Sequence, residues 1–134
     1  MNPMEDNPCI VCGPTNPIGL RVQYARDGDA GVAARLVVPT DFQGFRGIVH
    51  GGVLVALMDD AMWHAVFYRT GRSTVTVDLA TRFVKPAPVG TPLMVTASAG
   101  AMRHRLARAE ATVRDASTGE VLAQGEGRFM VSGG

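Results

Sequence analysis

The sequence is short of several residue types, and each shortage excludes a class of protein. Its 134 residues include only two cysteines, too few for a scaffold held by disulfides. Charged residues make up 19% and the formal net charge is +1, so no overall field attracts nucleic acid or an anionic membrane surface. Asp59, Asp60 and His64 interrupt the longest apolar stretch, which makes it a poor membrane span. The opening residues have neither the basic cluster nor the apolar run of a secretory signal. We therefore expect a cytoplasmic protein with no nucleic-acid or membrane partner.

What the chain does have is enough apolar material for one core. Hydrophobic residues make up 46%, and no shift in composition marks a boundary, so we expect a single domain over residues 1–134. Residues 1–18 form an irregular lead-in, because four prolines interrupt any regular element there.

The order of the predicted elements indicates an α+β fold. Alternating apolar residues predict strands over residues 19–29 and 31–39, joined as a hairpin by the turn "RDGDAG". A run from Gly51 or Gly52 to about Tyr68 has no period of two and predicts a long helix, which Gly71 should end. Four further strands follow, and in the third of them, "RLARAEATVRD", Ala107, Ala109, Ala111 and Val113 alternate with polar residues. Because the helix is apolar on most sides, we expect an antiparallel sheet of five to six strands to curl around it.

The first predicted strand after the helix alternates cleanly. The pattern puts Val75, Val77, Leu79 and Phe83 on one face, and Thr76, Asp78 and Arg82 on the other.

The motif "HGG" lies where the helix should begin. Gly51 and Gly52 have no side chains, so a ligand can approach backbone N–H groups that lack helical acceptors and lie at the positive end of the helix dipole. Such donors can stabilise a carbonyl oxygen as it becomes an oxyanion. A tight turn into the helix explains the same two glycines, and both interpretations remain open at this point.

Two aspartates inside the apolar helix have no packing role there. Asp59 lies eight residues after Gly51, roughly 12 Å along the helix axis, so one substrate carbon cannot contact both within one chain. Two copies with antiparallel helices would bring the two residues together, so a catalytic pair requires at least a dimer. The alternative is an ion pair or cap made by either aspartate. Adjacent residues point about 100° apart, so at most one aspartate serves this site.

Several motifs together carry a family resemblance. They are "GIVHGGVLVALMDDA", "VDLATRFVKPAPVG", the opening "CGPTNPIGL" and the final "ASTGEVLAQGEGRF". The chain resembles the hotdog-fold acyl-CoA thioesterases, particularly the phenylacetate-pathway branch related to 4-hydroxybenzoyl-CoA thioesterase. The resemblance implies a curled sheet around a long helix, dimers or dimers of dimers, and active sites at the subunit interface. It also implies hydrolysis of an acyl-CoA to the free acid and CoA without a metal or cofactor.

The resemblance assigns roles by position. Asp59 matches the family's acid, which acts as a nucleophile or as a base on water, and Gly51 matches the N–H that polarises the thioester carbonyl. His50 lines the same entry, and Thr76 matches a hydroxyl that places the attacking water. Asp60 falls at a variable position, so an ion pair or an interface contact is expected for it.

The substrate-binding assignments are less specific. Gly52 lies beside the thioester position, and Gln43 is a candidate helper to the oxyanion, because Gly44 stands where some relatives have Asn or Gln. Phe45, with Phe42, could gate an acyl pocket. Arg103 and Arg105 could hold CoA phosphates or form a solvated strand end.

The remaining features suggest no further chemistry. Cys9 and Cys12 lack a second cysteine pair and show no ligand spacing with a histidine, so structural or incidental thiols and no metal site are expected. Trp63, His64 and Phe67 fit core packing or the lining of an acyl pocket. Two other functions remain open: a hotdog hydratase or dehydratase, and a non-catalytic acyl-CoA-binding protein.

Overall fold

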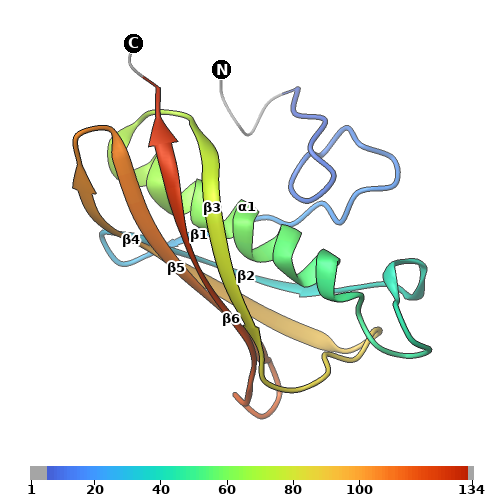
Figure 1. Ribbon diagram of the computed structural model, residues 1–134. Coiled ribbons are helices and arrows are strands. Elements are labelled where there is room, and N and C mark those ends of the chain that lie inside the picture. The colour runs from blue at the N-terminus through green and yellow to red at the C-terminus, as the bar shows by residue number, and fades with distance from the viewer. Residues whose placement is uncertain (1–5, 133–134) are drawn as a thin grey trace.

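One long helix lies in the curve of a six-stranded antiparallel sheet (Figure 1). This arrangement comes from a computed structural model, which describes residues 6–132. The strands follow the order β1-β2-β4-β5-β6-β3 across the sheet. The elements are β1 Ala25–Asp27, β2 Gly31–Val37, the short 3-10 turn η1 Thr40–Phe42, α1 Gly51–Thr70, β3 Thr74–Phe83, β4 Pro92–Arg103, β5 Leu106–Asp115 and β6 Val121–Val131. This is the hotdog fold, and it confirms the expected α+β class.

The helix begins and ends where the sequence indicates. His50 is the N-cap, and its Nδ1 accepts a hydrogen bond of 2.9 Å from the N–H of Gly52. Gly71 ends the helix with a φ of 73°, a left-handed conformation that glycine adopts without a steric penalty. Within residues 6–132, no helix has both the length and the apolar character required to cross a membrane.

The core lies between α1 and the concave face of the sheet. In β5 the buried residues are every second one, as the alternation predicts, and most are alanines that let the helix approach closely. Phe129 of β6 is the largest of the fully buried side chains in this core. The helix contributes Leu54, Leu57, Met58, Ala61, Met62, His64, Ala65 and Val66.

The first strand is shorter than predicted. Strand β1 begins at Ala25, because Arg21 has a φ of 53° and interrupts the extended backbone. Before that point the chain pairs with the lead-in: the N–H of Leu20 donates to Ile10 O and the N–H of Val22 donates to Val11 O, both at 2.9 Å. Residues 6–18 contain turns without helix or strand, as predicted, and residues 1–5 of the lead-in lie outside the described part.

The predicted faces of β3 are wrong on the N-terminal side of a bulge, where Val75 and Thr76 are exchanged. Thr76 pairs with Phe129 and Asp78 pairs with Arg128, so two steps along β3 match one step along β6. This β-bulge at Val77 puts Thr76 on the helix side of the sheet, with Phe129. Asp78 remains on the outer face, where its carboxylate forms an ion pair with Arg128.

Candidate active site

Asp59 lies in the middle of α1 and faces β3. Its Oδ1 accepts a hydrogen bond of 2.7 Å from Thr76 Oγ1, which the bulge has turned toward the helix. Burial raises the pKa of the Asp59 carboxyl above its ordinary value, and the hydrogen bond from Thr76 acts in the opposite direction. The structure therefore joins two predicted residues into one pair: a half-buried carboxylate that is a better base than an exposed one, and a hydroxyl that orients it.

The helix entry presents one unused backbone donor. The N–H of Gly52 is already taken by His50 Nδ1. Gly51 is the first helical residue, so its N–H has no acceptor within the helix, and the described part of the chain supplies none elsewhere. His50 accepts at Nδ1, so the proton of its neutral ring is on Nε2 and is available to a ligand. Of the two glycines, Gly51 is therefore the available oxyanion donor.

A cavity of about 880 Å³ opens at this helix entry. It lies between the loop before the helix and the segment that follows β3, and most of its lining is apolar. Phe45 is 86% exposed at its rim. Gln43 also lines it, with Oε1 accepting from the N–H of Gly47 at 2.9 Å, which leaves its amide N–H groups free for a ligand. The lining comprises Gln43, Gly44, Phe45, Ile48, Val49, His50, Gly51, Leu54, Phe83, Val84, Lys85, Pro86 and Ala87.

Sequence reasoning missed the second wall of this cavity. No binding role was predicted for the segment from Phe83 to Ala87, although it lines the cavity and a Cβ added at Gly51 would lie 3.5 Å from the Phe83 ring. The two prolines of "KPAP" were the available signal, because they end the strand and bring the chain back beside the helix entry.

Within one chain the predicted residues fall into three separate places. His50, Gly51, Gln43 and Phe45 line the cavity, whereas the Asp59–Thr76 pair lies outside it. Arg103 and Arg105 lie at the turn between β4 and β5, which Figure 1 shows beyond the other end of the helix. A hydrogen bond of 3.1 Å from Arg69 to Ala99 O ties this end of β4 to the last turn of α1. The two arginines therefore do not reach the cavity of their own chain.

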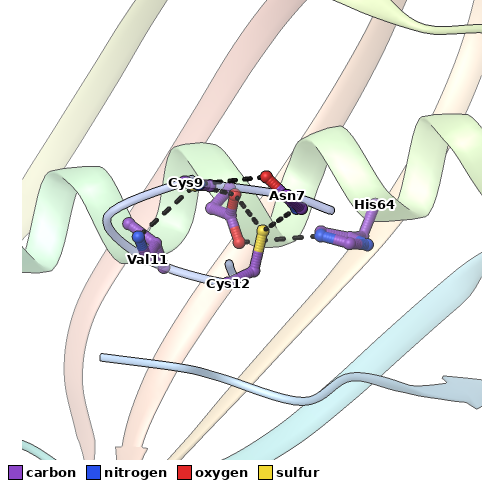
Figure 2. A network of polar contacts seen from close by, with 6 residues as sticks. Asn7, Cys9, Val11, Cys12 and His64 are labelled. Carbon is purple, nitrogen blue, oxygen red and sulfur yellow. Dashed lines mark hydrogen bonds and ion pairs between the residues drawn. The ribbon is translucent and has the colours of Figure 1, made fainter. Parts of the chain in front are cut away.

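Asp60 faces away from Asp59 and contacts the lead-in. Its Oδ1 accepts from Cys12 Sγ at 3.2 Å and from Cys9 Sγ at 3.5 Å (Figure 2). Its Oδ2 lies 3.7 Å from His64 Nε2. Burial and the charge of Asp60 raise the pKa of the Cys12 thiol. Burial lowers the pKa of His64, and the charge of Asp60 acts in the opposite direction. Folding thus brings together Asp60 and two cysteines about fifty positions before it in the sequence.

Comparisons with known proteins agree with this architecture. A family model described as "Thioesterase superfamily" matches residues 46–122. A solved thioesterase superfamily protein is 30% identical over 91% of this chain, with a TM-score of 0.85, and the match spans 62% of that protein's length. The S. sahachiroi protein AziG is 27% identical over 84% of this chain and 91% of its own, with a TM-score of 0.76.

A third structure shows the same fold at lower identity. It is the Streptococcus mutans protein smu.793 bound to acetyl CoA, 19% identical over 84% of this chain and 89% of its own, with a TM-score of 0.75. A search of curated proteins found no match. The family match covers more than half of the chain and includes both the helix entry and the Asp59–Thr76 pair, so this chain belongs to the thioesterase superfamily.

Proposed function

We propose that this protein is an acyl-CoA thioesterase. The observation that carries the proposal is the unused N–H of Gly51, which faces an apolar cavity at the start of the helix. The same fold in smu.793 accommodates acetyl CoA, which supports a CoA thioester as the substrate class. A thioester carbonyl placed against this N–H would be polarised, and its developing negative charge would be stabilised at the positive end of the helix.

Asp59 supplies the attack in this mechanism. Its carboxylate takes a proton from a water molecule, or attacks the carbonyl carbon directly, while Thr76 holds it in place at 2.7 Å. When Asp59 acts as the base, the water oxygen bonds to the carbonyl carbon, the C–S bond breaks, and the proton taken from water passes to the CoA sulfur. When Asp59 attacks directly, loss of CoA leaves a mixed anhydride on Asp59, which water then hydrolyses to release the acid and restore the carboxylate, while a proton from this water passes to the CoA sulfur. The products are a free acid and CoA, and no cofactor takes part in any step.

Strand β3 explains how two chains complete the site. Thr76 lies near one end of β3 and holds Asp59, whereas Phe83 ends β3 and lies against Gly51. If two β3 strands pair antiparallel about a two-fold axis near Leu79, Thr76 of one chain lies opposite Phe83 of the other. Asp59 then approaches Gly51 of the partner subunit, which removes the separation of roughly 12 Å within one chain.

The edge of the sheet supports this dimer. Strand β3 is the last strand of the sheet, so in the described chain its outer edge has no neighbouring strand. Three apolar side chains on it are well exposed: Val75 at 67%, Phe83 at 52% and Val77 at 49%. A long edge strand with exposed valines is a template for pairing with another chain, and a second copy would cover it.

Release of free CoA thiol from a panel of short, aromatic and long acyl-CoAs tests the activity. The wild type should release thiol from at least one of them, and Asp59→Asn should lose at least about 100-fold in kcat, because the acid or base is removed. Asp78→Asn is the matched control, since Asp78 is on the outer face of β3 and should leave the rate unchanged. Binding without thiol release would instead show an acyl-CoA-binding protein, and water addition to an enoyl-CoA would show a hydratase.

Subunit complementation tests the two-chain site. Asp59→Asn and Gly51→Pro proteins are each inactive under the proposal, but a mixed dimer contains one intact site. After unfolding and refolding together at equal concentration, the mixture should recover about one quarter of the wild-type activity, because half the dimers are mixed and each has one of two sites. No recovery above the separate proteins would place Asp59 and Gly51 in independent sites, and an active monomer by light scattering would also contradict the proposal.

A further inference from the structure

The lead-in and the helix form a second cluster that the proposed hydrolysis does not use. The sulfur atoms of Cys9 and Cys12 and a carboxylate oxygen of Asp60 all lie within 4.8 Å of one another. Figure 2 shows the C-x-x-C turn lying against α1, with the Cys12 sulfur directed at the carboxylate of Asp60 and the His64 ring pointing toward the same carboxylate. Two thiols and one acid therefore converge on a single point.

His64 is the independent sign that something binds there. Its side chain is 1% exposed, and neither ring nitrogen has a hydrogen-bond partner within residues 6–132. Asp60 Oδ2, the oxygen nearest to His64 Nε2, also lacks a hydrogen bond. Buried polar atoms are normally paired, and leaving one unpaired costs about 1–3 kcal/mol. The Tyr24 ring packs on the imidazole with centroids 4.5 Å apart and holds it toward the cluster.

Both sulfur atoms accept hydrogen bonds from N–H groups of the lead-in itself. The backbone N–H of Val11 donates to Cys9 Sγ at 3.3 Å, and the side-chain amide of Asn7 donates to Cys12 Sγ at 3.5 Å. Donors of this kind stabilise thiolate sulfur and orient it, as outer-shell groups do around metal ligands.

The distances match one coordination geometry. Bonds of about 2.3 Å to sulfur and about 2.0 Å to nitrogen or oxygen, at tetrahedral angles, place ligand atoms about 3.3–3.7 Å apart. The observed separations are 3.2 Å and 3.5 Å from Asp60 Oδ1 to the two sulfur atoms, and 3.7 Å from Asp60 Oδ2 to His64 Nε2. Asp60 Oδ1 is therefore already near the spacing to both sulfur atoms that a tetrahedral ion would impose, whereas His64 lies beside the other oxygen of Asp60, outside this group of three, and must move closer to complete the site.

We propose that Cys9, Cys12, Asp60 and His64 bind one zinc ion that ties the lead-in to the helix. Two thiolates, an imidazole and a carboxylate suit this borderline-soft, four-coordinate cation, and four protein ligands make the site closed and structural. A disulfide between the two cysteines would use neither Asp60 nor His64 and would leave the histidine unpaired. The zinc site differs from the metal-free interpretation that the sequence favoured.

Zinc binding should release a measurable number of protons. Each thiol loses its proton as its sulfur bonds to the metal, whereas the carboxylate and the neutral imidazole have none to lose. Binding of one Zn²⁺ to the reduced protein should therefore release about two protons in weakly buffered solution near neutral pH. No electron transfer or further reactant is involved.

Metal titration of the reduced wild-type chain tests the site without any substitution. After existing metal is removed with a chelator, zinc is added and excess zinc is removed by desalting, elemental analysis should find one zinc per chain retained, and zinc should protect both thiols from a thiol reagent. Co²⁺ as a spectroscopic substitute should give the absorption of a tetrahedral ion together with a thiolate-to-cobalt charge-transfer band. Zinc should also raise the unfolding temperature, because it binds the folded chain. Failure to retain zinc, or a cobalt spectrum without the thiolate band, would overturn the proposal.

Substitutions then assign the ligands. Cys12→Ser and His64→Gln should each weaken zinc retention by at least 10-fold, whereas His104→Gln, at the exposed β4–β5 turn, should leave it unchanged. Equal retention by all three variants would overturn the assignment. A Cys9–Cys12 disulfide in protein purified without reductant, combined with no zinc uptake after reduction, would show a redox pair in place of a metal site.

Discussion

Replacing Gly51 by proline removes one atom from the proposed site and changes little else. Proline has no N–H, so the proposed oxyanion donor disappears. Gly51 is the first helical residue, the position where proline is best tolerated in a helix. The preceding residue, His50, has φ −58° and ψ 134°, which is the extended conformation that a following proline requires. The helix should therefore form as before.

The size of the effect follows from the role of the donor. Loss of one backbone-type donor to an oxyanion costs about 10²–10³ in kcat, equal to about 2.7–4 kcal/mol of transition-state stabilisation. Gly51→Ala is the matched control, because it keeps the N–H and its Cβ would lie at an ordinary contact distance of 3.5 Å from the Phe83 ring. Alanine should retain kcat within about three-fold and stabilise the helix by about 0.5–1 kcal/mol.

The assay measures kcat and KM for thiol release with the best acyl-CoA of the panel. The proline variant should lose kcat, whereas the KM of both variants should stay near that of the wild type, because the lost interaction forms mainly in the transition state. Helical circular dichroism and thermal unfolding check that the fold is kept. If the folded proline variant is no slower than the alanine variant, the N–H of Gly51 does not stabilise the oxyanion and the mechanism is refuted.

Two further substitutions test the surroundings of the site. Thr76→Val removes the hydroxyl that donates to Asp59 at 2.7 Å, so kcat should fall about 10-fold while the fold stays intact. Thr76→Ser keeps a hydroxyl and should have a kcat near that of the wild type. Equal kcat values for the wild type and both variants would exclude a positioning role for the hydroxyl. Gly127→Ala places a Cβ 2.8 Å from Leu79 Cδ2, so the free energy of unfolding measured in urea should fall by about 1–3 kcal/mol. Gly100→Ala is the control, because its nearest contact is 3.5 Å, and it should change that free energy by less than about 0.5 kcal/mol. Equal stability of the two variants would contradict the packing argument.

Local patterns predicted the elements that local forces determine. The helix was expected from Gly51 or Gly52 to about Tyr68, and it runs from Gly51 to Thr70, because glycines mark both of its ends. The alternation over β5 likewise identified the core face of a central strand, where burial on one side gives a clear period of two. In each case the signal lies within a few residues of the feature.

Features that depend on long-range packing were missed or assigned wrongly. The alternation through Thr76 and Asp78 has no mark of the bulge at Val77, since the register against β6 decides it. Cys9 and Asp60 are 51 positions apart, and only the docking of the lead-in on the helix joins them. Arg103 and Arg105 appeared close to a substrate only because a sequence does not show which end of the helix a turn adjoins.

The strand order has a consequence for how the chain folds during synthesis. Strand β3 follows α1 directly, but its neighbour in the sheet is β6, the last strand described, so β3 remains unpaired until Val121–Val131 has been made. The helix has the same delay, because β4, β5 and β6, which cover much of its apolar surface, are all made after it. A ribosome-bound chain that stops before β6 should therefore bind a general chaperone and be digested quickly by protease, and both properties should change sharply once β6 emerges.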